Sequence, residues 1–182
     1  FPQVNLVIVL RAEEGLFLPH YKANERTFQL LLQALGRAGR KDERGKVILQ
    51  TSIPEHTVIK YALLQDYEGF FKEELQKRKM YGFPPFKKLA VFNFKGIDEK
   101  KITKVALKLK ENLESIKREH NLKIEILGPS PCPMRKLRGL YRWQILLKSD
   151  TYKDIKKILV CAQEIKSPGI KIDLDIDPES LL

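Results

Sequence analysis

Two arginines three residues apart stand out among the residues that could do chemistry. Arg37 and Arg40 lie in the segment 33–40, which reads QALGRAGR. At this spacing on a helix both guanidinium groups can face one side, and the glycines let the backbone approach a neighbour closely. Arginine suits phosphate because its rigid fork of N–H donors stays charged. The segment therefore predicts a phosphate contact; the alternative is a basic helix C-terminus that only stabilises the helix dipole.

A second group of cations occupies the segment 128–142, which contains no acidic residue. Its basic residues are Arg135, Lys136, Arg138 and Arg142. Prolines favour an extended loop here, and a glycine allows a tight turn. Just beyond, Tyr141 and Trp143 alternate with Arg142 and Gln144, and cations beside aromatic rings suit single-stranded DNA through phosphate neutralisation and base stacking. The alternative is a solvated hairpin in which Trp143 belongs to the core.

Metal chemistry finds little support in the sequence. Asp173, Asp175 and Asp177 would lie on one face of a strand, roughly 6.6 Å apart, which is too far for one ion. A calcium loop would also need a glycine turn and a later Glu. Cys132 and Cys161 alone cannot form a four-ligand zinc site or a disulfide framework. We therefore expect no metal within this chain.

The composition indicates a folded protein with an anionic partner. The 182 residues are 43% hydrophobic, which supports a packed core, and 34 Lys and Arg against 23 Asp and Glu give a net charge of +11. No apolar run reaches the eighteen residues of a membrane span, and no secretory signal is visible at the start, so we expect a cytoplasmic protein with no membrane partner.

The first part of the chain has the rhythm of an α/β layer. Strands are predicted at 4–10 and 46–51, and helices at 24–35, 56–64 and 67–80. Two strands cannot complete a sheet of this kind. Because the chain also does not begin with Met, we expect it to be a piece of a longer protein whose further strands lie upstream.

A Pro-Pro break at 82–86 separates this part from a more regular, more basic one. The two prolines must interrupt any helix and favour an extended connection. Beyond them, strands are predicted at 89–94, 123–127, 141–148 and 170–176, and helices at 98–120 and 152–165. This order is βαββαβ, an α+β arrangement known as the split βαβ pattern.

The motifs of the chain, taken in order, resemble one known family. The pattern Gln-x-x-Gly-Arg-x-Gly-Arg at 33–40 is similar to motif VI of superfamily-2 helicases. Further matching segments are ERTFQL at 25–30, PEH at 54–56, PP at 84–85, LGP at 127–129, RWQILL at 142–147 and DIDP at 175–178. This succession resembles the C-terminal end of the PriA (primosomal protein N′) family of bacterial replication-restart helicases.

The resemblance implies an ATP-dependent 3′→5′ DNA helicase that recognises stalled or branched forks and restarts replication by primosome assembly. Gln33, Gly36, Arg37 and Arg40 would contact the nucleotide, with Arg37 and Arg40 in the catalytic role. ATP and Mg²⁺ would bind mainly outside this chain, and the family's zinc module would lie upstream. Since the chain has no Walker A loop, we expect it to be inactive alone.

The resemblance also implies three regions: residues 1–64 as the C-terminal portion of a RecA-like lobe 2, 65–86 as a connecting helix and linker, and 87–182 as the C-terminal domain. In that domain, one set of residues would bind forked or single-stranded DNA, or the acidic tail of single-stranded DNA-binding protein. Other primosome proteins would be further partners. The set is Arg135, Lys136, Arg138, Arg142, Trp143 and Gln144. The alternative is a stand-alone nucleic-acid-binding or protein-docking βαββαβ module without a motor.

Overall fold

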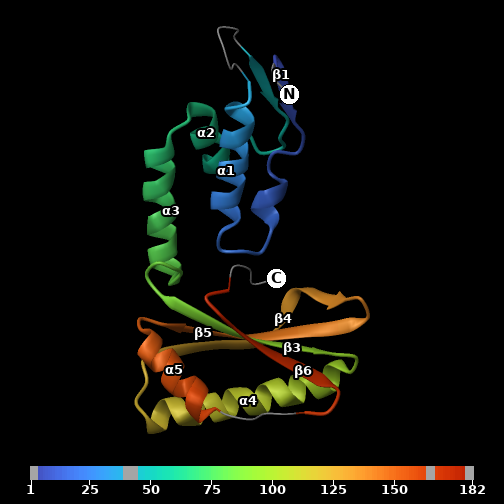
Figure 1. Cartoon of the computed structure of the whole chain (residues 1–182), viewed down its shortest axis with the longest axis vertical. Coiled ribbons are helices and arrows are strands. Elements are labelled where there is room, and N and C mark those ends of the chain that lie inside the picture. The colour runs from blue at the N-terminus through green and yellow to red at the C-terminus, as the bar shows by residue number, and fades with distance from the viewer. Residues whose placement is uncertain (1–3, 39–44, 163–166, 179–182) are drawn as a thin grey trace. The chain divides into compact units, whose positions relative to one another are not determined.

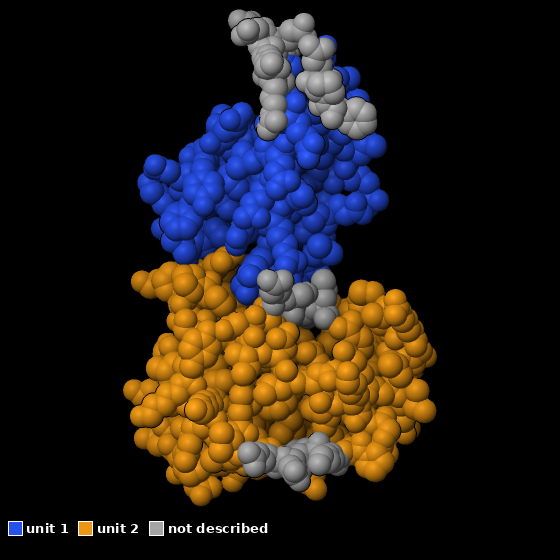
Figure 2. All heavy atoms as spheres, in the orientation of Figure 1, with its two compact units in different colours: residues 1–77 blue, residues 78–182 orange. Residues whose placement is uncertain are grey.

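Two separate hydrophobic cores divide the chain into two units, residues 1–77 and 78–182, coloured in Figure 2. The structure, a computed structural model, describes residues 4–38, 45–162 and 167–178. None of the helices in these ranges has the length and apolarity needed to cross a bilayer.

Unit 1 contains the predicted strands and helices. Its elements are β1 (Leu6–Val9), a short 3₁₀ helix (Glu14–Phe17), α1 (Ala23–Leu35), β2 (Lys46–Leu49), α2 (Thr57–Leu64) and α3 (Tyr67–Tyr81), the last of which continues into unit 2. The core forms where α1, α2 and α3 meet. Phe28 and Leu31 of α1 are buried with Ile59 of α2, and the ring of Phe28 stacks on that of Phe70 at 4.0 Å between centroids.

The strands β1 and β2 pair in parallel, as their apolar character predicts, with Leu6 opposite Lys46 and Ile8 opposite Ile48. One face of this pair packs on the core through Val9 and Leu49. The other face leaves Leu6, Ile8 and Ile48 exposed. Parallel sheets are normally covered on both faces. An uncovered apolar face is therefore the main structural peculiarity of unit 1.

Unit 2 confirms the predicted βαββαβ order. Its elements are β3 (Lys88–Gly96), α4 (Glu99–Glu119), β4 (Ile124–Leu137), β5 (Leu140–Ser149), α5 (Tyr152–Cys161) and β6 (Ile170–Ile176). The sheet order is β4-β5-β3-β6 and all neighbours are antiparallel. Figure 1 shows α4 and α5 on the same face of the sheet, as right-handed split βαβ units require.

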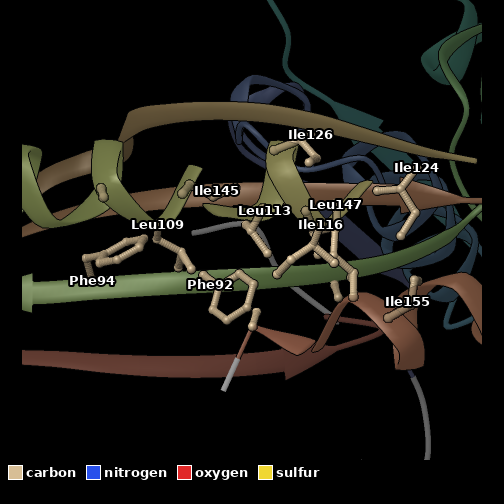
Figure 3. Close-up of a cluster of buried hydrophobic side chains, with 14 of the residues drawn as sticks. Phe92, Phe94, Leu109, Leu113, Ile116, Ile124, Ile126, Ile145, Leu147 and Ile155 are labelled. Carbon is tan, nitrogen blue, oxygen red and sulfur yellow. The ribbon is translucent and has the colours of Figure 1, made fainter. Parts of the chain in front are cut away.

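The core of unit 2 lies between this face and the helices. Alternate residues of β3 and β5, including Phe92, Phe94 and Ile145, point toward α4, where Leu109 and Leu113 are buried (Figure 3). The stripe on α4 follows the 3.6-residue period of an amphipathic helix. The helix begins where predicted, because the carboxylate of Asp98 accepts a hydrogen bond from the amide of Lys101 at 3.1 Å.

Three details of the prediction were wrong. Most of 128–142 is not a loop, because β4 runs to Leu137. It pairs with β5 at Ser130 and Pro131 and, after a register shift, again at Lys136 and Leu137. As an edge strand, β4 tolerates prolines at its register shifts. The break at 82–86 is a turn, not an extended connection, with the amide of Phe86 bonded to the carbonyl of Phe83. Finally, α5 ends at Cys161, four residues before the predicted end, which lies outside the described residues.

Candidate nucleic-acid interface

The cations of 128–142 are carried by the β4–β5 hairpin. Leu137 pairs with Leu140, so only Arg138 and Gly139 form the turn. Both have positive φ, +49° and +82°, which is the geometry of a type I′ turn. A Cβ built on Gly139 would meet no atom within 4 Å. The hairpin tip is therefore a tight, projecting turn, with Arg138 exposed on it.

A carboxylate that the sequence did not point to organises the base of this tip. Arg135 donates two hydrogen bonds to Glu99, from Nε to Oε1 at 2.8 Å and from Nη2 to Oε2 at 2.7 Å. The indole Nε1 of Trp143 donates to the same Oε1 at 3.0 Å. The pKa of Glu99 is lowered, chiefly by the bond from Arg135, with Trp143 adding to the effect. We call these three residues the Glu99 node.

The Glu99 node joins three elements that are distant in sequence. Glu99 is the first residue of α4, Arg135 lies on β4 and Trp143 on β5. Trp143 also packs against the core of unit 2, so its ring is half-buried. An acidic residue in the first turn of a helix normally needs no partner beyond the helix dipole. The spacing of 36 residues between Glu99 and Arg135 gave no sequence signal of their contact.

The remaining hairpin residues fall on two faces of β5. Lys136 lies opposite Tyr141, with its Nζ 4.7 Å from the ring centroid, on the same face as Trp143. Arg142 and Gln144 alternate with these aromatics and therefore lie on the other face, away from the helices. The six predicted residues thus form two groups, as the alternation of aromatic and polar residues along 141–144 predicts.

The face that carries Arg142 and Gln144 is mixed in charge. In the sheet register Arg142 is opposite Lys95 of β3. The carboxylate of Asp173 on β6 offsets two lysines there, with Nζ of Lys95 at 3.4 Å and Nζ of Lys171 at 3.2 Å. No group of three or more His, Cys, Asp or Glu in the described ranges could hold a metal ion. Asp173 instead has an ion-pairing role.

Cys132 lies buried beneath the same face, where its Sγ is 3.9 Å from Oε1 of Gln144. Burial raises the pKa of the Cys132 thiol. A thiol with a raised pKa is a poor nucleophile. Cys132 is therefore a packing residue.

In unit 1, the predicted nucleotide-facing residues lie at the C-terminal end of α1. The helix ends at Leu35, and Gly36 caps it by donating to the carbonyl of Leu32 at 2.9 Å. The side chains of Gln33 and Arg37 are exposed and form no hydrogen bond or ion pair in the part of unit 1 that the structure describes. Arg40, the second predicted arginine, lies outside the described residues.

Glu13 is a further polar residue of unit 1 whose role sequence reasoning missed. It follows β1, and its Oε1 accepts two hydrogen bonds from Ser52, which follows β2: from the hydroxyl at 2.8 Å and the amide at 3.2 Å. Glu13 is only 9% exposed. Its pKa is lowered to about 2, first by a hydrogen bond from its own backbone and then by the Ser52 hydroxyl. The pair ties together the ends of two parallel strands.

Comparison with known proteins places the chain in a family. Residues 79–179, which include all six elements of unit 2, match the family model described as the primosomal protein N C-terminal domain. Curated relatives also match along nearly the whole chain. Proteins called replication restart protein PriA from Synechocystis, Bacillus subtilis and Rickettsia prowazekii are 35%, 34% and 40% identical over 98%, 100% and 99% of it.

These alignments cover 21%, 23% and 27% of the relatives' own lengths, so the chain spans about a quarter of the proteins that it resembles. The match extends across both units, and the family model covers more than half of the chain. The chain belongs to the PriA family, and its residues 79–179 are the C-terminal domain of that family.

Proposed function

We propose that the chain is part of an ATP-dependent 3′→5′ DNA helicase that recognises stalled or branched replication forks and restarts replication. The observation that carries the DNA-binding part of this proposal is the β4–β5 hairpin, a projecting type I′ turn with cations and aromatic rings at its tip. The relatives' printed name, replication restart protein, supports the biological setting.

At the hairpin, the available cations neutralise backbone phosphates and the aromatic side chains provide contact for bases. Arg138 has no hydrogen-bond or ion-pair partner among the described residues, and the ammonium of Lys136 is exposed above Tyr141. Arg135 is already bound to Glu99, so its contribution depends on releasing that carboxylate. The first contacts with DNA therefore come from Lys136 and Arg138.

Unit 1 would supply the C-terminal portion of a RecA-like lobe 2. Two features support this: β1 and β2 are parallel, and their exposed apolar face is suited to being covered by further elements. In that lobe Gln33, Gly36, Arg37 and Arg40 would face the ATP phosphates bound with Mg²⁺ in the other lobe. A well-placed arginine there can accelerate phosphoryl transfer by roughly 10³–10⁵.

The acidic tail of single-stranded DNA-binding protein is a second candidate ligand of unit 2. The separation of Arg142 and Gln144 from the tip favours it, because that face of the sheet offers a site of its own. The proposal then assigns DNA to the tip and the acidic tail to Arg142 and Gln144. In a stand-alone module without a motor, both ligands could bind, but Arg37 and Arg40, which follow α1, would have no nucleotide to face.

The motor assignment is tested by Arg40→Ala in the intact, full-length protein. ATP hydrolysis should be abolished while the affinity for forked DNA stays nearly unchanged. Normal turnover in this variant would remove the nucleotide-facing role of the segment.

The two ligand assignments are separated by titrating the chain with a labelled DNA fork and, independently, with an acidic tail peptide. Arg138→Glu should weaken binding of the fork only, and Gln144→Ala binding of the peptide only. Equal effects of both variants on both ligands would contradict the assignment of the two ligands to two separate sites.

A further inference from the structure

The last strand of unit 2 forms a sheet edge that none of the proposed activities uses. β6, drawn in red in Figure 1, pairs with β3 alone, in a register without shifts over seven residue pairs. No other strand of the described residues lies on its outer side. At its start, the amide of Ile170 is used within a turn, where it donates to the carbonyl of Ser167 at 3.1 Å. The free edge of β6 therefore runs from Ile172 to Ile176.

The main-chain groups of β6 point alternately toward β3 and away from it. The amide of Asp177, directly after the strand, donates to the carbonyl of Leu89 at 2.9 Å. In an antiparallel pair, every second residue bonds to the neighbouring strand, and the residues between them point their amides and carbonyls to the other side. These outward groups belong to Ile172, Leu174 and Ile176. They make no hydrogen bond with the part of the chain that the structure describes.

The two edges of this sheet differ in how they are protected. Edge strands are normally blocked against further pairing by prolines, bulges or lysines. The β4 edge has prolines at 129, 131 and 133 and two register shifts. β6 has no proline and no shift, and its one lysine, Lys171, precedes the free edge and pairs with Asp173 at 3.2 Å. The free edge of β6 is therefore able to accept another strand.

The side chains along the free edge indicate what kind of strand fits. On the helix side, Leu174 is 43% and Ile176 51% exposed. On the other side, the carboxylate of Asp173 already has Lys95 and Lys171 as partners. Asp175 is exposed and has no ion pair with any described residue. A complementary strand therefore has apolar residues on one face and a basic residue on the other.

We propose that the free edge of β6 binds an extended segment of a separate protein by antiparallel strand addition. The main chain of the segment bonds to the outward groups of Ile172, Leu174 and Ile176. Its apolar side chains cover those of β6, and a Lys or Arg lies opposite Asp175. The site is at the opposite edge of the sheet from β4, so it does not depend on DNA binding at the hairpin.

Two other occupants fit this edge less well. A nucleic-acid backbone has no row of amides and carbonyls to match the strand, and its phosphates would be repelled by Asp175. A second copy of β6, antiparallel over the same stretch, would place Asp173 of one chain opposite Asp175 of the other at two points. Like charges directly opposite each other destabilise a strand pair.

The first test uses the full chain and a fluorescein-labelled peptide, Thr-Val-Lys-Val-Lys-Val-Thr, followed by fluorescence anisotropy. Leu174→Pro removes an outward amide and should raise Kd at least about tenfold. The pairing with β3 should survive, because an edge strand tolerates proline where the N–H faces solvent. Asp175→Lys should raise Kd at least about threefold. The matched control Glu111→Lys, on an exposed position of α4, makes the same change of charge and should alter Kd by no more than about 1.5-fold.

The second test distinguishes strand addition from attraction of charge alone and needs no variant of the chain. N-methylation of the central valine of the peptide, whose amide would face Leu174, should weaken binding at least about tenfold. N-methylation of the lysine that follows it, whose amide would face solvent, should change Kd by no more than about threefold. In the chain, saturating peptide should slow hydrogen exchange at the amides of Ile172, Leu174 and Ile176 at least about tenfold.

The proposal is overturned if the peptide does not bind, if the two methylated peptides bind equally, or if the outward amides stay unprotected at saturating peptide. It also fails if Glu111→Lys matters as much as Asp175→Lys. Protection of the outward amides that grows with chain concentration without peptide would assign the edge to a second copy and overturn the proposal. The intact, full-length protein should bind the peptide equally well; absence of binding there would mean that the longer protein covers its own edge, which also contradicts the proposal.

Discussion

Replacing Glu99 by Gln should make the hairpin bind DNA better. In the native chain Glu99 holds the guanidinium of Arg135 through two hydrogen bonds. A phosphate can use Arg135 only in competition with that carboxylate. The amide of Gln removes the charge but keeps an oxygen for the indole of Trp143, so the hairpin retains its position. Arg135 then becomes available as a further cation.

The magnitude follows from counting available cations. Each phosphate neutralised on a single strand contributes about −0.7 to the slope of log K against log salt. Lys136 and Arg138 alone predict a slope of about −1.4, and releasing Arg135 predicts about −2.1. Between about 200 and 50 mM salt, the affinity of Glu99→Gln relative to the native chain should therefore rise roughly 2.6-fold.

The assay is fluorescence anisotropy of labelled oligo-dT at four or more salt concentrations. Glu111→Gln is the matched control, because it removes the same charge from α4 about 18 Å further along the helix. Its slope should equal that of the native chain. If Glu99→Gln shows the same slope as the native chain, Glu99 does not restrain Arg135. The same conclusion follows if the native slope is already near −2.8, which is about −0.7 for each of four cations.

Three predictions concern stability. Leu113→Ala should cost about 2–5 kcal/mol in unit 2, because Leu113 is fully buried, and the urea midpoint followed by Trp143 fluorescence should fall accordingly. Gly139→Val forces a β-branched residue to φ +82° and should cost about 1 kcal/mol or more by the same readout; an unchanged midpoint would argue against the type I′ turn. The pKa of Glu13 is lowered from 4.5 to about 2, so its stabilisation is complete above pH 4.5 and is lost as pH falls toward 2. In Glu13→Gln, the free energy of unfolding of unit 1, measured by hydrogen exchange, should depend less on pH over that range than in the native chain.

The fold of unit 2 was predictable because local pattern and global arrangement agree. The apolar stripe of α4 and the cap at Asp98 define a helix without knowledge of its neighbours. The apolar run of β3 and the alternation of apolar and charged residues in β6 likewise define strands. The β4 extension was missed because its strand character comes from pairing with β5, and prolines carry the opposite local preference.

The candidate site was predictable only in composition. The cations of the hairpin are visible in the sequence, and so is the glycine that its turn requires. Which residues of β4 lie beside those of β5, such as Lys136 beside Tyr141, depends on the register of the two strands. The contact of Arg135 with Glu99 depends on how α4 packs on the sheet, which no spacing reveals. Sequence reasoning therefore could not distinguish Arg135, which is bound to a carboxylate, from the other cations.

The most direct test of the hairpin as the DNA-binding element is a ¹H–¹⁵N NMR titration of the chain with unlabelled oligo-dT. We predict that the largest shifts occur at the amides of Lys136, Arg138 and Gly139 and at the indole N–H of Trp143. Shifts confined to unit 1 or to α5, or no shifts at saturating DNA, would contradict the account.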